Sequence, residues 1–344
     1  MKYIKSYLRW LAIFTLSSSI SILVSAWLFT ATIADRKTVK SWFETSTVYQ
    51  TFTDEIITQS TIPVDQNNLT LDQNTLKTAA QVSFTPEVLQ NSTETFLDAS
   101  YDWLEGTSQK LSFSIDFTQQ KADFSQSISD QAITRLNSLP LCSNAELTQL
   151  GAQSTAIDPF TVSCRPPDAM NQSLAADLER SVALSPDFIP NSVITDQDLK
   201  RVFIDTNNSS FEETFSYVPS LFRLAKAGVI IALGLFAASL ITLRMLGVET
   251  FRIARRLAKS LFFSALSTGI LSGIITYYSS QAADSTDASF VESLIGVAAP
   301  DILKITLTFT GIYIMLAIMC FILYRLLKKR WMLRHSTTPE QPYR

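Results

Sequence analysis

The sequence predicts a mainly α-helical membrane protein with four transmembrane helices and a mostly helical extracytoplasmic domain between the first and the second of them. Apolar residues make up 47% of the 344 residues, and they gather in one run near the N-terminus and three runs in the last third. Basic residues dominate on one side of the expected membrane and acidic residues on the other. The 184 residues between the first and second runs contain two glycines, too few for the many tight turns of a β-sandwich.

The first transmembrane helix is predicted over residues 11–33, which carry no charge. At a rise of about 1.5 Å per residue, a run of this length crosses the roughly 30 Å of bilayer hydrocarbon. Val24 and Ala26 also match the cleavage pattern of a signal peptide, but the apolar run continues to Ile33, so we expect a retained anchor. Three further transmembrane helices are predicted over residues 221–243, 260–278 and 303–325.

The distribution of charge predicts that both termini are cytoplasmic, because basic residues flank spans on the cytoplasmic side. The N-terminus (1–10), a basic loop (244–259) and the tail (326–344, together with Arg325) hold 14 Lys and Arg against 2 acidic residues. The domain at 34–217 has 25 acidic and 11 basic residues, and a short loop at 279–301 is acidic. Four spans in the plasma membrane place every basic segment in the cytoplasm and every acidic segment outside. The tail is expected to be disordered. The basic loop carries Arg244, Arg252, Arg255, Arg256 and Lys259.

Helical signals predominate in the displayed domain. Apolar residues at three- and four-residue steps predict a helix over 37–59, which we expect to continue the first span outward. Thr85 before Pro86 predicts the start of a helix that Gly106 ends. Ser143 and Glu146 form a capping box for a short helix through residue 150. Alternation over 111–117 predicts one strand, with no evident partner.

Cysteine spacing predicts one disulfide. Cys142 and Cys164 lie in the displayed domain, where an oxidising exterior would pair them. Metal ligation is the alternative, but two thiols without a nearby histidine are an incomplete ligand set. Cys320 falls inside the fourth span, where we interpret it as a small apolar residue.

The inventory of reactive residues predicts no enzyme, no cofactor, no metal and no nucleic-acid partner. The only histidine is His335 in the tail, so no Ser-His or Cys-His dyad can form in the displayed domain. No glycine-rich phosphate loop follows a strand. The carboxylates at helical spacing are interpreted as solvated helix faces; they are Asp98, Asp102, Glu105, Asp196 and Asp198.

Small residues in two spans predict close helix packing. Gly269 and Gly273 form a GxxxG pattern in the third span. One face of the first span carries Ser17, Ser21 and Ser25. Packing within the chain explains both patterns, and a homodimer seam is the alternative.

These observations predict a non-enzymatic multi-pass protein, embedded in the lipid bilayer, whose displayed domain binds or senses a partner protein or envelope component outside. A second hypothesis comes from the layout of one span, a large exterior domain and three clustered spans. It resembles the membrane subunits of the MacB/FtsX class of ABC systems, and residues 244–249 leading to Arg255 and Arg256 resemble their basic coupling segment. This resemblance implies a cytoplasmic ATPase as partner. The third span lacks the expected richness in glycine, and the displayed domain shows no matching pattern. The alternative is that these arginines serve only orientation and contact with lipid phosphates.

Overall fold

The computed structural model describes residues 2–46, 48–49, 73–152, 158–184, 191–207, 211–284 and 290–336. The protein is mainly helical, and four helices are long and apolar enough to cross a membrane: α1 (Lys2–Ala31), α11 (Val218–Met245), α12 (Thr250–Asp284) and α13 (Phe290–Ser336). A helical domain lies between the first and second of these helices, as predicted. The chain forms two compact units, Met1–Trp42 with Tyr217–Arg344 and Phe43–Ser216. We call them the membrane unit and the inserted unit.

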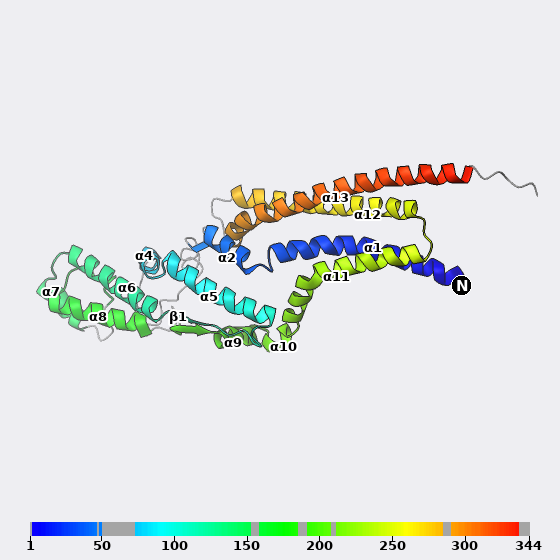
Figure 1. Ribbon diagram of the computed structural model, residues 1–344. Coiled ribbons are helices and arrows are strands. Elements are labelled where there is room, and N and C mark those ends of the chain that lie inside the picture. Colours follow the sequence, from blue (N-terminus) through cyan, green and yellow to red (C-terminus); the bar gives the residue numbers. More distant parts are fainter. Residues whose placement is uncertain are drawn as a thin grey trace, which may run out of the picture. The chain divides into compact units, whose positions relative to one another are not determined.

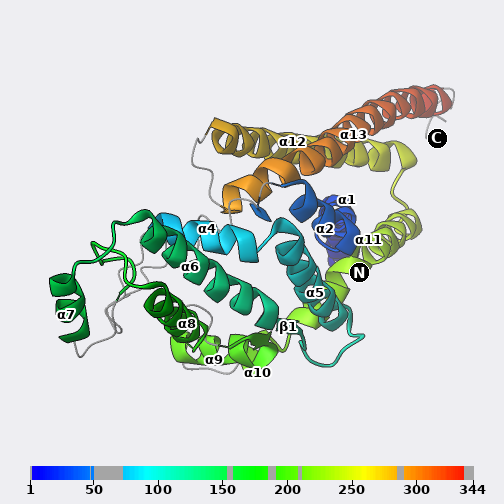
Figure 2. The ribbon, with the colours of Figure 1, turned by 90° about the vertical axis from the view of Figure 1, so that its left-hand side faces the viewer.

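In the membrane unit, α1 lies beside α11 and α12 lies beside α13 (Figures 1 and 2). Two apolar clusters join these pairs. In one cluster, Ile20 and Val24 of α1 pack with Leu261 of α12 and Tyr313 of α13. The other consists of Ala12, Leu16, Leu243 and Ile253. Helix α1 therefore contributes to both clusters and connects the two pairs.

Hydroxyl groups form the contact between α12 and α13. Ser272 donates to Thr306 at 2.9 Å, and Thr310 donates to Thr268 at 2.8 Å. These four side chains are buried or half-buried, and bonds of this kind hold helices together where no water competes. The seam between these two spans thus includes a polar stretch of serine and threonine beside the apolar cluster.

The small residues that predicted close helix packing make few tight contacts between the described helices. A Cβ on Gly269 would lie 3.8 Å from the Thr310 methyl group, an ordinary contact, and one on Gly273 would meet nothing within 4 Å. On α1, Ser17 is half-buried and Ser21 and Ser25 are exposed. The hydroxyl of Ser21 lies 3.5 Å from that of Ser264 on α12. The glycine spacing indicated the face of α12 that carries Gly269 and Gly273. The hydrogen bonds to α13 come from the adjacent face, which carries Thr268 and Ser272.

Helices α1 and α11 approach each other closely at Gly228, a glycine that the sequence patterns did not indicate. A Cβ on Gly228 would lie 2.8 Å from the Cβ of Ala26, well inside van der Waals contact. We expect Gly228→Ala to push the helices apart and lower stability by about 1–3 kcal/mol. The measurement is the thermal unfolding midpoint of the full chain in detergent.

Gly234→Ala is the matched control, because it lies on the same helix with nothing within 4 Å of its added Cβ and gains the same helix propensity. Adding Ala26→Gly to Gly228→Ala should restore the midpoint. Equal shifts for the two single variants would show that this close contact contributes nothing.

The first span does not continue outward as one helix, so that prediction was wrong. Helix α1 ends at Ala31, and α2 (Arg36–Thr45) begins anew after Asp35. Asp35 accepts hydrogen bonds from the Thr38 hydroxyl at 2.6 Å and the Thr38 amide at 3.2 Å, as an N-cap does. The indole of Trp42 donates to Asp301 of α13 at 2.8 Å. The predicted stretch 50–59 lies outside the described residues.

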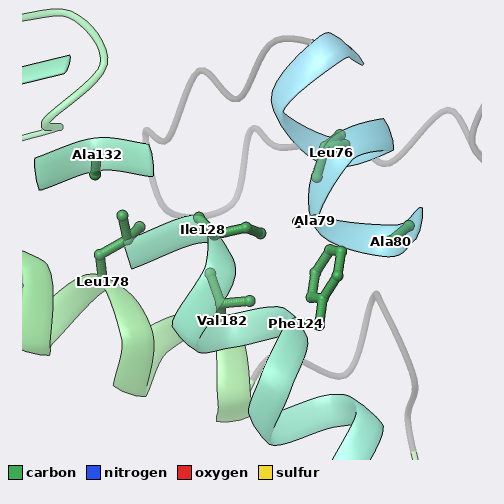
Figure 3. Packing of buried hydrophobic residues seen from close by; sticks show 8 residues of the cluster. All are labelled: Leu76, Ala79, Ala80, Phe124, Ile128, Ala132, Leu178 and Val182. Atoms are coloured by element: carbon green, nitrogen blue, oxygen red, sulfur yellow. The ribbon is translucent and has the colours of Figure 1, made fainter. Parts of the chain in front are cut away.

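The core of the inserted unit lies between α4 (Gln73–Ser83), α6 (Thr118–Ser138) and α8 (Asp168–Leu184). Figure 3 shows their side chains turned toward one another, and the cluster consists of Leu76, Ala79, Ala80, Phe124, Ile128, Ala132, Leu178 and Val182. Within each helix these residues recur at steps of three or four, so they share one face.

Local capping signals were read correctly. Helix α5 (Pro86–Glu105) begins after Thr85, whose side chain accepts from the Val88 amide, and ends at Gly106 with a positive φ of 83°. Helix α7 (Asn144–Ala152) begins with the predicted box, in which the Ser143 amide donates to Glu146 at 2.7 Å. These ends depend on residues adjacent in sequence, which is why the sequence alone indicates them.

The predicted strand has a distant partner. Strand β1 (Ser114–Asp116) pairs antiparallel with β2 (Val193–Thr195), with Ile115 opposite Ile194. Helix α9 (Asp196–Asn207) follows β2 directly, and α10 (Phe211–Phe215) precedes α11. A three-residue strand is too short to show alternation, so β2 escaped the sequence patterns.

Helices extend into segments that were predicted to be loops or disordered. In the segment 244–259, only the turn between Met245 and Thr250 is not helical, and Gly247 there has a φ of 70°. Helix α12 continues to Asp284 and α13 begins at Phe290, so the described residues of 279–301 are helical, and 285–289 lie outside the described residues. Helix α13 also runs through 326–336, and 337–344 lies outside the described residues. Lysine and arginine end the apolar runs from which the spans were predicted. They are good helix formers, however, so the helices continue past those runs.

Candidate functional site

Four of the five basic residues predicted to form a loop lie on one face of α12. Arg252, Arg255, Arg256 and Lys259 follow one another at helical steps and are exposed. The opposite face buries Ile253, Ala254 and Ala258. The first turns of α12 are therefore amphipathic, with a strongly cationic outer face.

This cationic face forms one wall of a groove of about 490 Å³. Helix α12 supplies Phe251, Arg252, Arg255, Arg256 and Lys259, and α13 supplies Tyr324 and Lys328. No acidic residue is among these lining residues. Sequence reasoning missed Tyr324 and Lys328, because their distance in sequence from Arg255 hides that α12 and α13 meet here. The signal that could have found them is an aromatic residue and a basic residue one helical turn apart at the end of the last span.

Aromatic rings lie beside several of the groove's cations. The Arg255 guanidinium lies 5.8 Å from the centroid of the Tyr324 ring, and the Lys328 ammonium lies 6.0 Å from it. Phe251 packs on Trp331 with ring centroids 5.8 Å apart. Cations held against rings lose little further side-chain freedom when an anion binds. The groove is thus preorganised for negative charge.

Other arginines of the membrane unit lie at the same end of the helices as the groove. Arg9 of α1 donates to the carbonyl of Leu246 at 2.8 Å, and Arg244 of α11 donates to the Thr250 hydroxyl at 2.7 Å. Arg252 is paired with Glu249 at 2.7 Å. Arg244 therefore braces the turn and does not line the groove.

A disulfide anchors a second candidate site, on the inserted unit. Cys142 is bonded to Cys164, as predicted. Beside it, the Cys142 amide donates to the Arg165 carbonyl at 3.0 Å, and the Arg165 amide donates to the Pro140 carbonyl at 2.7 Å. These bonds close a segment that contains α7. Of the α7 residues whose burial is described, 144–150, none is buried. We call residues 141–164 the disulfide loop. Leu141 at its base is 69% exposed.

Two of the carboxylates at helical spacing, Asp196 and Asp198, have structural tasks. Asp198 accepts from the amide and the hydroxyl of Thr195 at 2.9 and 2.8 Å, and so caps α9. Asp196 forms an ion pair with Lys200 at 2.8 Å in which both side chains are mostly covered. The interpretation of Asp196 as part of a solvated helix face was therefore wrong. Asp98, Asp102 and Glu105 are half-buried on α5.

Hydrogen bonds lower the pKa of several capping carboxyls. The amide of Thr195 has the largest effect on the pKa of Asp198, followed by its hydroxyl. The Thr118 hydroxyl lowers the pKa of Asp116, and the Ser143 amide lowers that of Glu146. Each group therefore favours its charged form in the folded chain, which suits a helix cap rather than a general acid.

These shifts predict how stability depends on pH. A folded-state pKa below the unfolded value contributes stability that is present above the unfolded pKa and is lost as pH falls through the folded pKa. Since unfolded carboxyls titrate near about pH 4, we expect the urea midpoint of the inserted unit to be constant near neutrality and to fall at more acid pH. Asp198→Asn, which retains an acceptor, should flatten this fall. An unchanged slope in that variant would contradict the prediction.

Among the described residues, no group of three or more His, Cys, Asp and Glu side chains is placed to hold a metal ion. No protein-family model matches the chain, and no curated protein or solved structure is significantly similar to it.

Proposed function

We propose that this chain is a non-enzymatic membrane protein whose inserted unit lies outside the cytoplasm and binds a partner protein or envelope component there. The observation that carries the proposal is the disulfide loop. The disulfide joins the two ends of this loop, and the α7 residues between them are exposed or half-buried wherever their burial is described.

The chemistry of the inserted unit supports its placement outside the cytoplasm. Structural disulfides persist in oxidising compartments, and the Cys142–Cys164 bond belongs to this unit. The segment 34–217 carries 25 acidic against 11 basic residues. The basic contacts of Arg9, Arg244 and Arg255 gather at one end of the membrane unit, which fits that end facing the cytoplasm.

Reporter fusions test the sidedness. Fusions after Arg36 and near Asp284 should report the exterior, and fusions near Arg256 and Arg334 should report the cytoplasm. A cytoplasmic signal at Asp284 would contradict the four-span topology. A mature N-terminus at Trp27 would replace the first span by a signal peptide.

Site-specific photocrosslinking tests the partner. A photoreactive residue at Thr148 or Gln149, both exposed on α7, should crosslink to one extracytoplasmic species in intact cells. The same residue at Gln119 is the control, because it is exposed at the opposite end of α6. Crosslinking should fail when Cys142 and Cys164 are replaced by serine. Equal products from Gln119 and Thr148 would show that the disulfide loop is not the binding surface.

A cytoplasmic ATPase at the basic end is the second proposal. It is supported by the exposed cationic face of α12, where Arg255 and Arg256 lie. Gentle solubilisation should then co-purify a nucleotide-binding subunit, and replacing both arginines by glutamate should release it. A preparation that brings down no ATPase would remove this proposal.

A further inference from the structure

The cationic groove lies at the depth of lipid headgroups. The apolar stretches of α12 and α13 end at residues 260 and 324, and the groove's lining residues lie between 251 and 259 on α12 and at 324 and 328 on α13. At about 1.5 Å per residue, Lys259 and Lys328 lie within roughly one helical turn of the hydrocarbon boundary. The headgroup layer, a few ångströms thick on each face of the roughly 30 Å core, therefore reaches the groove.

The groove holds more positive charge than the chain neutralises there. Of its five cationic residues, Arg252 is paired with Glu249. Arg255 and Lys328 lie against the ring of Tyr324, and no acidic side chain is among the residues that line the groove. Arginine binds phosphate oxygens in a bidentate manner. Such a surplus suits a ligand with more than one phosphate charge.

The same face of α12 continues into exposed apolar residues. Beyond Lys259, at helical steps, come Phe262, Phe263 and Leu266, which are 58%, 65% and 52% exposed. A cationic groove followed along one helix face by an apolar strip matches a molecule with an anionic head and acyl chains. A soluble phosphate compound has no acyl chains and would contact only the cationic groove.

We propose that this groove is a binding site for an anionic phospholipid with two phosphate groups, its head in the groove and its acyl chains along Phe262, Phe263 and Leu266. Arg255 and Arg256 bind the phosphate oxygens, and Tyr324 holds Arg255 and Lys328 in position. The site differs from diffuse attraction of basic residues to a charged membrane in being concave and in joining two helices.

Native mass spectrometry of the full chain released from bilayers of defined composition tests this site. The bilayers contain phosphatidylcholine alone or with phosphatidylglycerol or diphosphatidylglycerol, and inorganic phosphate and ATP are added separately in detergent. In the mass spectra we expect each chain to retain one diphosphatidylglycerol and to retain phosphatidylglycerol more weakly. In detergent, inorganic phosphate and ATP should leave the thermal unfolding midpoint of the chain unchanged.

The variant Arg255→Gln/Arg256→Gln should weaken diphosphatidylglycerol binding by at least about tenfold, since each basic contact with a phosphate contributes measurably. Lys329→Gln/Arg330→Gln removes the same charge from exposed positions of α13 outside the groove and should change binding by less than about twofold. Arg255→Lys/Arg256→Lys keeps the charge but loses the bidentate geometry, and should bind more tightly than the glutamine variant and less tightly than the wild type, which separates loss of charge from misfolding.

Equal weakening by the groove and control variants would overturn the proposal in favour of diffuse attraction. Binding of inorganic phosphate or ATP as tight as that of lipid would assign the groove to a soluble ligand. Equal retention of phosphatidylglycerol and diphosphatidylglycerol would refute the preference for two phosphates. Release of a co-purified ATPase by Arg255→Gln/Arg256→Gln, with lipid binding unchanged, would make the groove a protein contact.

Discussion

Phe124→Ala is expected to lower the free energy of unfolding of the inserted unit by about 3–5 kcal/mol, the largest effect of any single substitution considered. The Phe124 side chain is 1% exposed and belongs to the cluster formed by α4, α6 and α8 (Figure 3). Its removal forfeits the burial of an aromatic ring and leaves a cavity that neighbouring alanines cannot fill. Urea titration of the full chain in detergent, followed by pulse proteolysis of the inserted unit, measures the change.

A leucine pair on α8 provides the matched control for core packing. Leu178→Ala, at a position 3% exposed, should cost about 2–5 kcal/mol. Leu184→Ala makes the same chemical change at a position 75% exposed and should cost less than about 0.5 kcal/mol. Similar losses at the two leucines would show that this cluster is not the core that stabilises the unit.

Removal of the disulfide has the second large effect. Replacing Cys142 and Cys164 by serine should lower the stability of the inserted unit by about 3 kcal/mol, because the unfolded chain is no longer closed into a loop across a separation of 22 residues. The same titration measures it, and limited proteolysis should now cut near α7 before the rest of the unit.

Cys320→Ser is the control, because this thiol lies in α13 and forms no disulfide. It should leave the titration of the inserted unit unchanged. If the Cys142 and Cys164 variant unfolds at the wild-type midpoint, the two backbone hydrogen bonds beside the disulfide hold the loop without it.

The features predicted from the sequence depend on nearby residues or on composition. The four spans follow from apolar length, and both ends of α5 follow from Thr85, Pro86 and Gly106. The disulfide followed from the count of cysteines in one segment. The break after α1 also had a local signal, because Asp35 precedes a helix and reaches Thr38, but the apolar periodicity beyond it obscured that cap.

The features that were missed depend on which helices become neighbours. Strand β2 is three residues long and exists because β1 lies beside it. The groove requires that Tyr324 reach Arg255 across two helices. The contact between Thr268 and Thr310 likewise depends on the rotation of α12 against α13, which neither sequence pattern specifies.

The bond between Trp42 and Asp301 joins α2 to α13. The inserted unit begins at the residue after Trp42, so the chain is hydrogen-bonded to α13 directly before that unit starts. Asp301 follows Pro300 inside α13, where the missing backbone donor favours a bend. The candidate span Glu292–Leu333 is 42 residues long, about twice the length needed to cross the hydrocarbon, so a large part of this helix must lie beyond the apolar layer.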